Sequence, residues 1–113
     1  MDIVDAHVHL WTDDTEKYPE VFPRPSYMRE RRFDPADYWP LVEPLGVSRA
    51  VLIQTEVYGA DLSYAMDVVA SDDRFRAIGM IDPASPPTRT DIASHRSGGV
   101  VGYRLFMRDE HEL

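Results

Sequence analysis

Two histidines near the start of the chain, His7 and His9, have the spacing of metal ligands. They end an apolar run, within the sequence Asp5-Ala6-His7-Val8-His9. Side chains of an extended strand alternate between its faces, so Asp5, His7 and His9 are predicted to share one face and Val4, Ala6 and Val8 the other. The two histidine Cα atoms would lie roughly 6.5 to 7 Å apart, which lets both rings reach one zinc-like ion at about 2.0 to 2.1 Å. The spacing therefore predicts a metal site.

The alternative is a pair of solvated histidines on an edge strand, which a His-x-His pattern alone does not exclude. The position of the pair favours the metal site. The histidines come where the apolar residues 3–6 give way to a polar loop, and α/β folds place their chemistry at that end of a strand.

The elements that must position this site alternate between strand and helix signals along the chain. Apolar runs predict further strands at residues 50–54, 77–81 and 100–106. Between them, Asp34-Pro35 reads as the N-cap and first residue of a helix that ends near Leu45-Gly46 and is shortened or kinked by its prolines. A second helix is predicted with Asp61 as its cap and Leu62, Ala65, Met66 and Val69 on one face, and a short, weak third helix around Ile92. This alternation predicts a parallel sheet in the order 1-2-3-4 with helices on its outer face.

A long polar segment, residues 12–32, follows the first strand and is too long for a plain connection. It contains three prolines and the aromatic residues Tyr18, Phe22 and Tyr27. It could lie over the C-terminal end of the sheet as a lid or a subunit contact, or be a solvated surface excursion.

Arg104 is the best candidate beyond the histidines. Counting by twos places Gly102, Arg104 and Phe106 on one face near the end of the fourth strand. A planar guanidinium there could bind a substrate carboxylate, and the alternative is a structural salt bridge.

Other polar residues give weaker signals. Gln54 and Glu56, at the end of the second strand, could face the same mouth. Asp82 is expected at a strand-to-turn transition, with lining of the site as the alternative. His95 is expected to be a surface residue of a helix, and His111 to be solvated in the charged tail.

Composition excludes several classes of protein. The 113 residues contain no cysteine, so disulfides and cysteine-ligated metal are excluded. A net charge of −8 argues against nonspecific nucleic-acid binding. The chain shows neither a signal peptide nor an apolar run long enough to cross a bilayer, so we expect a cytoplasmic protein with no membrane contact.

The first strand, Ile3-Val4-Asp5-Ala6-His7-Val8-His9-Leu10-Trp11, resembles that of the amidohydrolase superfamily. The likeness is to the amidohydrolase-related branch of TIM-barrel hydrolases, lactonases and decarboxylases. Residues 51–54, 77–83 and 99–105 are similar to the second, third and fourth strands of that branch.

This resemblance implies a divalent metal ion, zinc or else manganese, bound by His7 and His9 together with ligands from later strands. It also implies an arginine at the end of strand four, here Arg104, that binds an acidic small-molecule substrate. The catalytic aspartate of the family comes from the eighth strand, so no catalytic residue is assigned in this chain.

Length limits what the chain can form. A (β/α)8 barrel needs about 250 residues, so we expect residues 1–113 to be a single domain, the N-terminal half of a TIM barrel with about four parallel strands. Its open sheet should associate with another copy, as a homo-oligomer, or with a complementing half barrel. We expect a truncated metal-dependent hydrolase, inactive alone, whose parent hydrolyses a lactone, amide or ester. The alternatives are a metal-dependent non-oxidative decarboxylase and a non-enzymatic α/β binding or assembly module.

Overall fold

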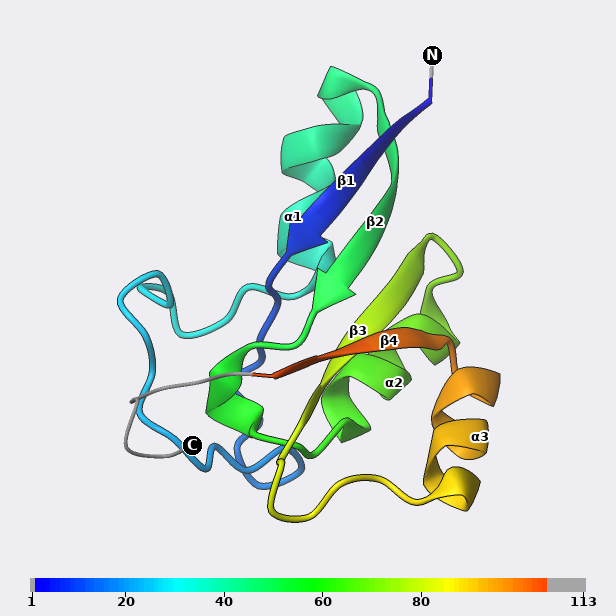
Figure 1. Ribbon diagram of the computed structural model, residues 1–113. Coiled ribbons are helices and arrows are strands. Elements are labelled where there is room, and N and C mark those ends of the chain that lie inside the picture. The colour runs from blue at the N-terminus through cyan, green and yellow to red at the C-terminus, as the bar shows by residue number, and fades with distance from the viewer. Residues whose placement is uncertain (1, 106–113) are drawn as a thin grey trace.

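The computed structural model describes residues 2–105 and contains one sheet of four parallel strands in the order β1-β2-β3-β4. Figure 1 shows the strands side by side, with β1 at one edge and β4 at the other. The strands are β1 (Ile3–Val8), β2 (Val47–Ile53), β3 (Phe75–Ile81) and β4 (Val100–Leu105). The predicted parallel sheet and its strand order are confirmed.

The first helix begins and ends as its sequence predicts. In α1 (Pro35–Val42), Asp34 is the N-cap and forms a capping box with Asp37, which satisfies amide groups that have no partner within the helix. The helix then tightens into η1 (Glu43–Leu45). Gly46 ends this segment with a φ of 89°, a left-handed conformation that glycine adopts without a steric penalty.

The second helix, α2 (Ser63–Ser71), follows the short η2 (Glu56–Tyr58) and differs in detail from the prediction. Its N-cap position is Leu62 rather than Asp61, although the Asp61 carboxylate accepts a 3.0 Å hydrogen bond from the Ser63 amide. Its buried face also differs from the predicted face in two members, because Met66 and Val69 are only partly buried against the core. The buried residues of the helix are Tyr64, Ala65 and Val68.

The third helix, α3 (Arg89–Ser97), is held by its ends more than by packing. Thr88 and Asp91 form a capping box at its start, and none of its residues is buried. This agrees with the expectation of a short, weak helix. Across residues 2–105, no helix has the length and apolar character needed to span a bilayer.

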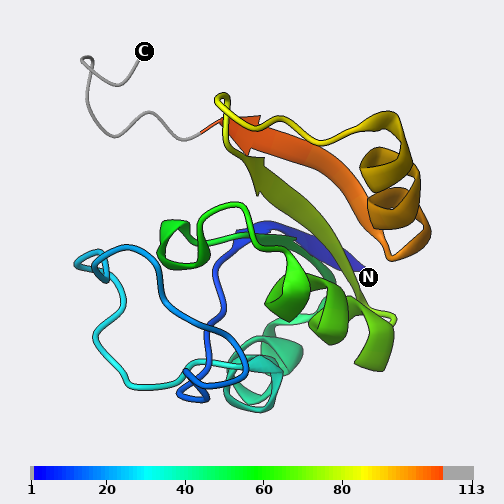
Figure 2. The same cartoon turned by 90° about the horizontal axis from the view of Figure 1, so that it is seen from below.

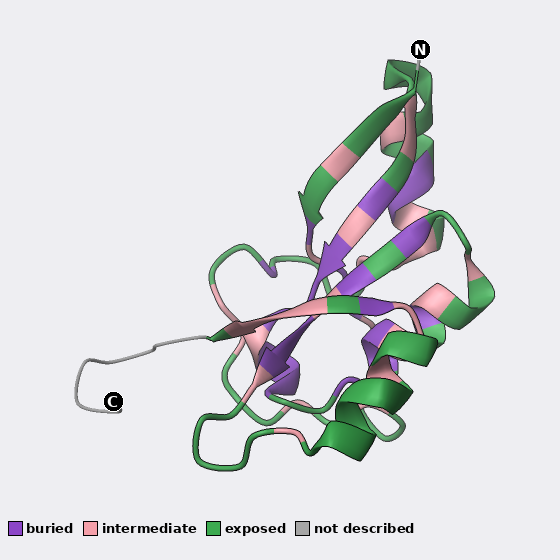
Figure 3. Ribbon diagram, turned by 45° about the vertical axis from the view of Figure 1, so that its right-hand side comes forward, coloured by how far each residue is buried: buried purple, intermediate pink, exposed green. Residues whose placement is uncertain are grey.

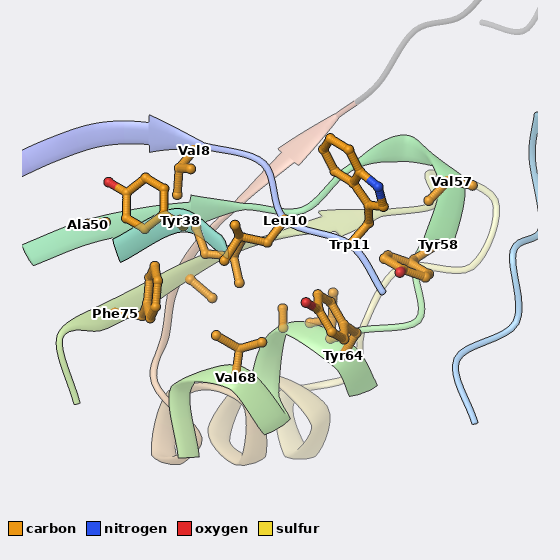
Figure 4. Packing of buried hydrophobic residues seen from close by; sticks show 14 of the residues in the cluster. Val8, Leu10, Trp11, Tyr38, Ala50, Val57, Tyr58, Tyr64, Val68 and Phe75 are labelled. Carbon is orange, nitrogen blue, oxygen red and sulfur yellow. The ribbon is translucent and has the colours of Figure 1, made fainter. Parts of the chain in front are cut away.

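The hydrophobic core lies between one face of the sheet and the helices α1 and α2. Figure 2 shows both helices on the same side of the curved sheet. Phe75 and Leu52, from neighbouring strands, are at most 1% exposed. In Figure 4 the side chains of Phe75 and Val8 extend from the strands, and that of Val68 from α2, into this layer.

The opposite face of the sheet, which we call the inner face, is open. Val4 and Val101 are 55% and 62% exposed. Arg49 and Arg76 border a hollow of about 600 Å³ at the end of the sheet where the strands begin. Figure 3 shows β1 largely exposed, whereas β2 and β3 alternate between buried and more accessible residues.

Candidate metal centre

An irregularity in β1 sets the direction of its side chains. Asp5 pairs with Ala50 and Val8 with Leu52, so β1 uses three residue steps where β2 uses two. Such a bulge inserts one unpaired residue and re-aims the side chains beyond it. Asp5 and Val8 therefore lie on the helix-covered face, although they are three positions apart in the chain.

This bulge corrects one prediction. Asp5 does not share the face of His7 and His9, because its carboxylate accepts a 2.8 Å hydrogen bond from the hydroxyl of Tyr38, a buried residue of α1. The other Asp5 oxygen accepts a 3.1 Å hydrogen bond from the His7 amide. Asp5 thus anchors the backbone of the His7 segment to the helix layer.

The two histidine side chains converge as their spacing predicts. The Nε2 atoms of His7 and His9 are 3.1 Å apart, and the rings meet edge to face with centroids 4.8 Å apart. His7 is exposed and His9 is half-buried. One ring therefore faces solvent while the other is held by the protein.

The chemistry of the pair fits a divalent metal ion. His9 Nδ1 lies 2.9 Å from the carbonyl oxygen of Ile53, to which it must donate its hydrogen. In a neutral imidazole this leaves Nε2 as the atom with the free lone pair, directed at His7. Two nitrogens at 3.1 Å could both lie about 2.0 to 2.1 Å from one ion, at an angle of roughly 100°.

The surroundings of His9 favour its neutral form. Burial lowers its pKa, and the nearby His7 and Arg104 lower it further, against the opposing effect of the hydrogen bond to Ile53. A neutral imidazole is the form that binds metal. Within residues 2–105, no three histidine, cysteine, aspartate or glutamate side chains come together as a group that could hold an ion.

Arg104 lies beside the histidine pair. Its Nη1 donates a 3.3 Å hydrogen bond to the carbonyl oxygen of Gln54, and its charge acts on both His9 and Tyr27. The side chain is half-buried at the end of β4. A cation is thus placed at the C-terminal ends of the strands, on the same side as the histidines.

Gln54 does not face the mouth as the sequence suggested. Its side chain is buried, and its Nε2 donates to the carbonyl oxygens of Gly59 and Asp61 at 2.6 and 3.0 Å. These bonds fix the connection between η2 and α2. Glu56 lies half-buried in η2. Burial raises the pKa of Tyr27, and the charge of Glu56 adds to this effect.

Two residues beside His9 had no sequence signal of their own. The ring of Tyr27 stacks on the His9 imidazole, with centroids 4.8 Å apart and an angle of 18° between the planes. The Tyr27 hydroxyl lies 2.7 Å from Oγ1 of Thr55, which directly follows β2. Tyr27 was visible only as one of several aromatics in a long loop, and its contact with His9 depends on the path of that loop.

The segment between β1 and α1 folds back over the ends of the strands. Trp11 and Phe33 pair through two 3.0 Å backbone hydrogen bonds, which close the segment at its base. The amides of Val21 and Phe22 donate to the Val57 carbonyl oxygen in η2. The segment is therefore attached to the domain at several points, although most of its residues are exposed.

The remaining candidates lie away from the histidine pair. His95 lies on α3, a helix with no buried residues, and is itself half-buried, with its Nδ1 2.6 Å from the Tyr103 hydroxyl. Both border a hollow of about 460 Å³ together with Asp82, whose carboxylate accepts a hydrogen bond from the Ala84 amide in a turn. His111 and Phe106 lie outside the described residues.

Comparison with known proteins places these features in a family. The family described as Amidohydrolase matches residues 4–112. A 4-sulfomuconolactone hydrolase from Rhizobium radiobacter is 32% identical over 112 residues, and one from Hydrogenophaga intermedia is 31% identical over 113 residues. Each match covers 95% of this chain and 34% of the relative, so the chain spans about a third of their length.

Solved structures share the fold. A crystal structure of a probable 2-pyrone-4,6-dicarboxylic acid hydrolase from Acinetobacter baumannii, with citric acid bound, matches with a TM-score of 0.74 at 18% identity, over 93% of this chain and 38% of that chain. An Agrobacterium tumefaciens protein matches with a TM-score of 0.75 at 25% identity, over 89% and 34%. The four strands are therefore part of a TIM-barrel type of fold, as predicted. Because the family match covers nearly the whole chain, this protein belongs to the amidohydrolase family.

Proposed function

We propose that His7 and His9 are two ligands of a divalent metal ion, zinc or manganese, in a hydrolase that opens an acidic lactone. The observation that carries this proposal is the geometry of the pair. The Nε2 atoms lie 3.1 Å apart, and the Ile53 carbonyl oxygen leaves the lone pair of His9 directed toward His7. Imidazole nitrogens are common ligands of zinc, and a carbonyl group often fixes the tautomer of such a ligand.

When bound, such an ion acidifies a water molecule and polarises the carbonyl group that is attacked. The residues of this chain would hold and orient the reactants around it. Asp5 fixes the His7 backbone, and Ile53 fixes the ring of His9. Arg104 would bind an acid group of the substrate, because a guanidinium pairs well with carboxylates.

The names of the relatives support an acidic lactone as the substrate class. The curated relatives are named as hydrolases of 4-sulfomuconolactone, which carries a sulfonate. One structural relative is named for a dicarboxylic acid and holds citric acid. Arg104 is a cation close to the histidine pair, as its hydrogen bond to the Gln54 carbonyl oxygen and its electrostatic effect on His9 indicate. We therefore assign it to the acid group.

Metal titration of the 113-residue chain tests the histidine site. Calorimetry with zinc should detect weak binding, because two protein ligands are fewer than the three or four of a tight site. His7→Ala and His9→Ala should each abolish it. His95→Ala is the matched control, since its ring bonds to Tyr103 elsewhere in the fold, and should leave binding unchanged. Binding that survives both strand substitutions but is lost in the control would refute the proposal.

A binding experiment tests the substrate class. In the presence of zinc, 2-pyrone-4,6-dicarboxylate should shift nuclear magnetic resonances near His9 and the end of β4. Arg104→Leu should remove these shifts, and Arg96→Leu on the exposed α3 should not. Shifts that persist in the Arg104 variant would refute the assigned role. We expect little or no hydrolysis by this chain alone, because the family's remaining ligands and its aspartate come from later strands.

We further propose that the inner face is covered when a complete barrel forms, by a second copy or a complementing half barrel. Within residues 2–105, β1 and β4 each pair with one strand and form the edges of the sheet, and exposed strand edges recruit further strands. Apolar Val4 and Val101 are exposed beside them. Sedimentation at micromolar concentration should show association of the isolated chain, and a compact, fully folded monomer would contradict this proposal.

A further inference from the structure

Tyr27 is held against the histidine pair at two points. Its ring lies nearly parallel to the His9 imidazole, 4.8 Å away, and its hydroxyl reaches Thr55, whose side chain is 1% exposed. Thr55 Oγ1 also lies 3.5 Å from the sulfur of Met28, to which it donates. Because a threonine hydroxyl has one hydrogen, the assignment that satisfies both contacts has Tyr27 donating to Thr55.

We propose that Tyr27 is a positioning residue that fixes the plane of the His9 ring and so directs its Nε2 toward His7. This inference rests on the proposed role of the pair as metal ligands. The Ile53 carbonyl restrains one nitrogen of His9, but a single hydrogen bond does not by itself fix the plane of the ring. The terminal torsion of a histidine has a broad energy profile. A flat aromatic surface against the imidazole removes this freedom.

The support behind Tyr27 is rigid. Thr55 is held between β2 and η2, and Met28, the residue after Tyr27, is buried. Trp11, which is 5% exposed, flanks the Tyr27 ring with centroids 6.2 Å apart. The long segment after β1 therefore places one of its own side chains, that of Tyr27, against His9 at the end of that strand. Positioning of ligands by their neighbours typically changes metal affinity by about 10-fold to 100-fold.

Three substitutions distinguish the effect of the Tyr27 ring from the effect of the hydrogen bond between its hydroxyl and Thr55. Tyr27→Leu removes the stacking surface, Tyr27→Phe keeps it but loses the hydroxyl, and Thr55→Val removes the acceptor of that hydroxyl. Tyr18→Phe is the matched control, because Tyr18 lies in the same segment and donates to Asp67 at 2.6 Å. Backbone amide spectra establish that each variant is folded.

Zinc affinity of the intact chain is the first measurement. We expect Tyr27→Leu to weaken zinc binding by about 10-fold or more, in line with the loss of a supporting residue. Tyr27→Phe and Thr55→Val should both show smaller losses, since each removes one end of the same hydrogen bond and keeps the ring. Tyr18→Phe should bind as the parent does. Parental affinity in Tyr27→Leu, or an equal loss in the control, would overturn the proposal.

The orientation of the His9 ring in the metal-free chain is the second measurement, by nuclear Overhauser effects between its ring protons and those of His7. The parent and Tyr27→Phe should show the contacts of one fixed orientation, and Tyr27→Leu weaker contacts averaged over several orientations. If the parent binds no zinc, the proposed function fails, and this second measurement decides alone whether Tyr27 positions the ring. The parental pattern of contacts in Tyr27→Leu would then overturn the inference.

Discussion

The two faces of the sheet differ in what covers them. The outer face is sealed by α1 and α2, and its strand residues Leu52, Phe75 and Ala77 are at most 1% exposed. The inner face has no such cover, and Val4 and Val101 are more than half exposed. Apolar burial stabilises a fold by about 25 cal/mol per Å², so the stability of this chain comes mainly from the outer face.

The candidate site lies at the C-terminal ends of the strands, where residues of both faces contribute to it. Asp5 turns outward to Tyr38, while His7 and His9 converge on each other. The packed face therefore supplies rigidity, and the open face supplies access. The site can therefore be ordered although one side of the sheet is uncovered.

Phe75→Ala should have the largest effect on stability. Phe75 is fully buried and packs between Tyr38 and Trp39, so its loss should lower the free energy of unfolding by about 3 to 5 kcal/mol. The neighbouring Arg76→Ala, on the exposed face, should change it by less than about 0.5 kcal/mol. Urea unfolding measures both, and similar losses would contradict the difference between the faces.

Val100→Ala and Val101→Ala offer a matched pair, since the same residue type occurs on adjacent positions of β4. Val100 is 4% exposed and Val101 is 62% exposed. In the monomeric chain, the buried substitution should cost about 2 kcal/mol, from two lost methyl groups and a small cavity, and the exposed one less than about 0.5 kcal/mol. Equal midpoints in thermal unfolding, at a concentration low enough to keep the chain monomeric, would contradict the difference between the two faces.

Acid should lower the stability of the helix-covered side of the sheet by protonating the carboxylate of Asp72. Burial opposes ionisation of this carboxyl, but hydrogen bonds from Arg74 and Trp39 outweigh that effect and lower its pKa. A carboxyl whose pKa is lower in the folded state stabilises the fold above its unfolded pKa of about 3.9, and this contribution is lost as the pH falls through the folded value.

The free energy of unfolding should therefore fall as the pH drops below about 4. Asp72→Asn should flatten this part of the profile and lower stability at pH 7 by about 1 kcal/mol. Asp73→Asn, on the exposed neighbour, is the control. If the Asp72 variant kept the parental pH profile, protonation of Asp72 would not be the cause of the loss of stability in acid.

Local signals predicted the elements well. Asp34-Pro35 marks the start of α1, and Gly46 marks the end of the helical segment, because caps and prolines act through the backbone of their own neighbourhood. The four strands also follow from continuous apolar runs. The convergence of His7 and His9 follows from the period of a strand.

What the sequence did not predict depends on pairing between distant segments. The bulge that turns Asp5 outward depends on the register of β1 against β2. The inward turn of Gln54 depends on carbonyl oxygens of the connection that follows it. The stacking of Tyr27 on His9 requires the path of a segment without repetitive structure.

The bulge in β1 also makes one position of that strand tolerant of deletion. Removing a residue from a regular strand inverts every side chain on one side of the cut. In β1, removing Ala6 would instead leave two steps from Asp5 to Val8, equal to the two steps from Ala50 to Leu52. Asp5 would keep its contact with α1, both histidines would still point inward, and the strand would lose about 3.3 Å of length. The chain therefore carries one residue more than the pairing of β1 requires, immediately before the two histidines.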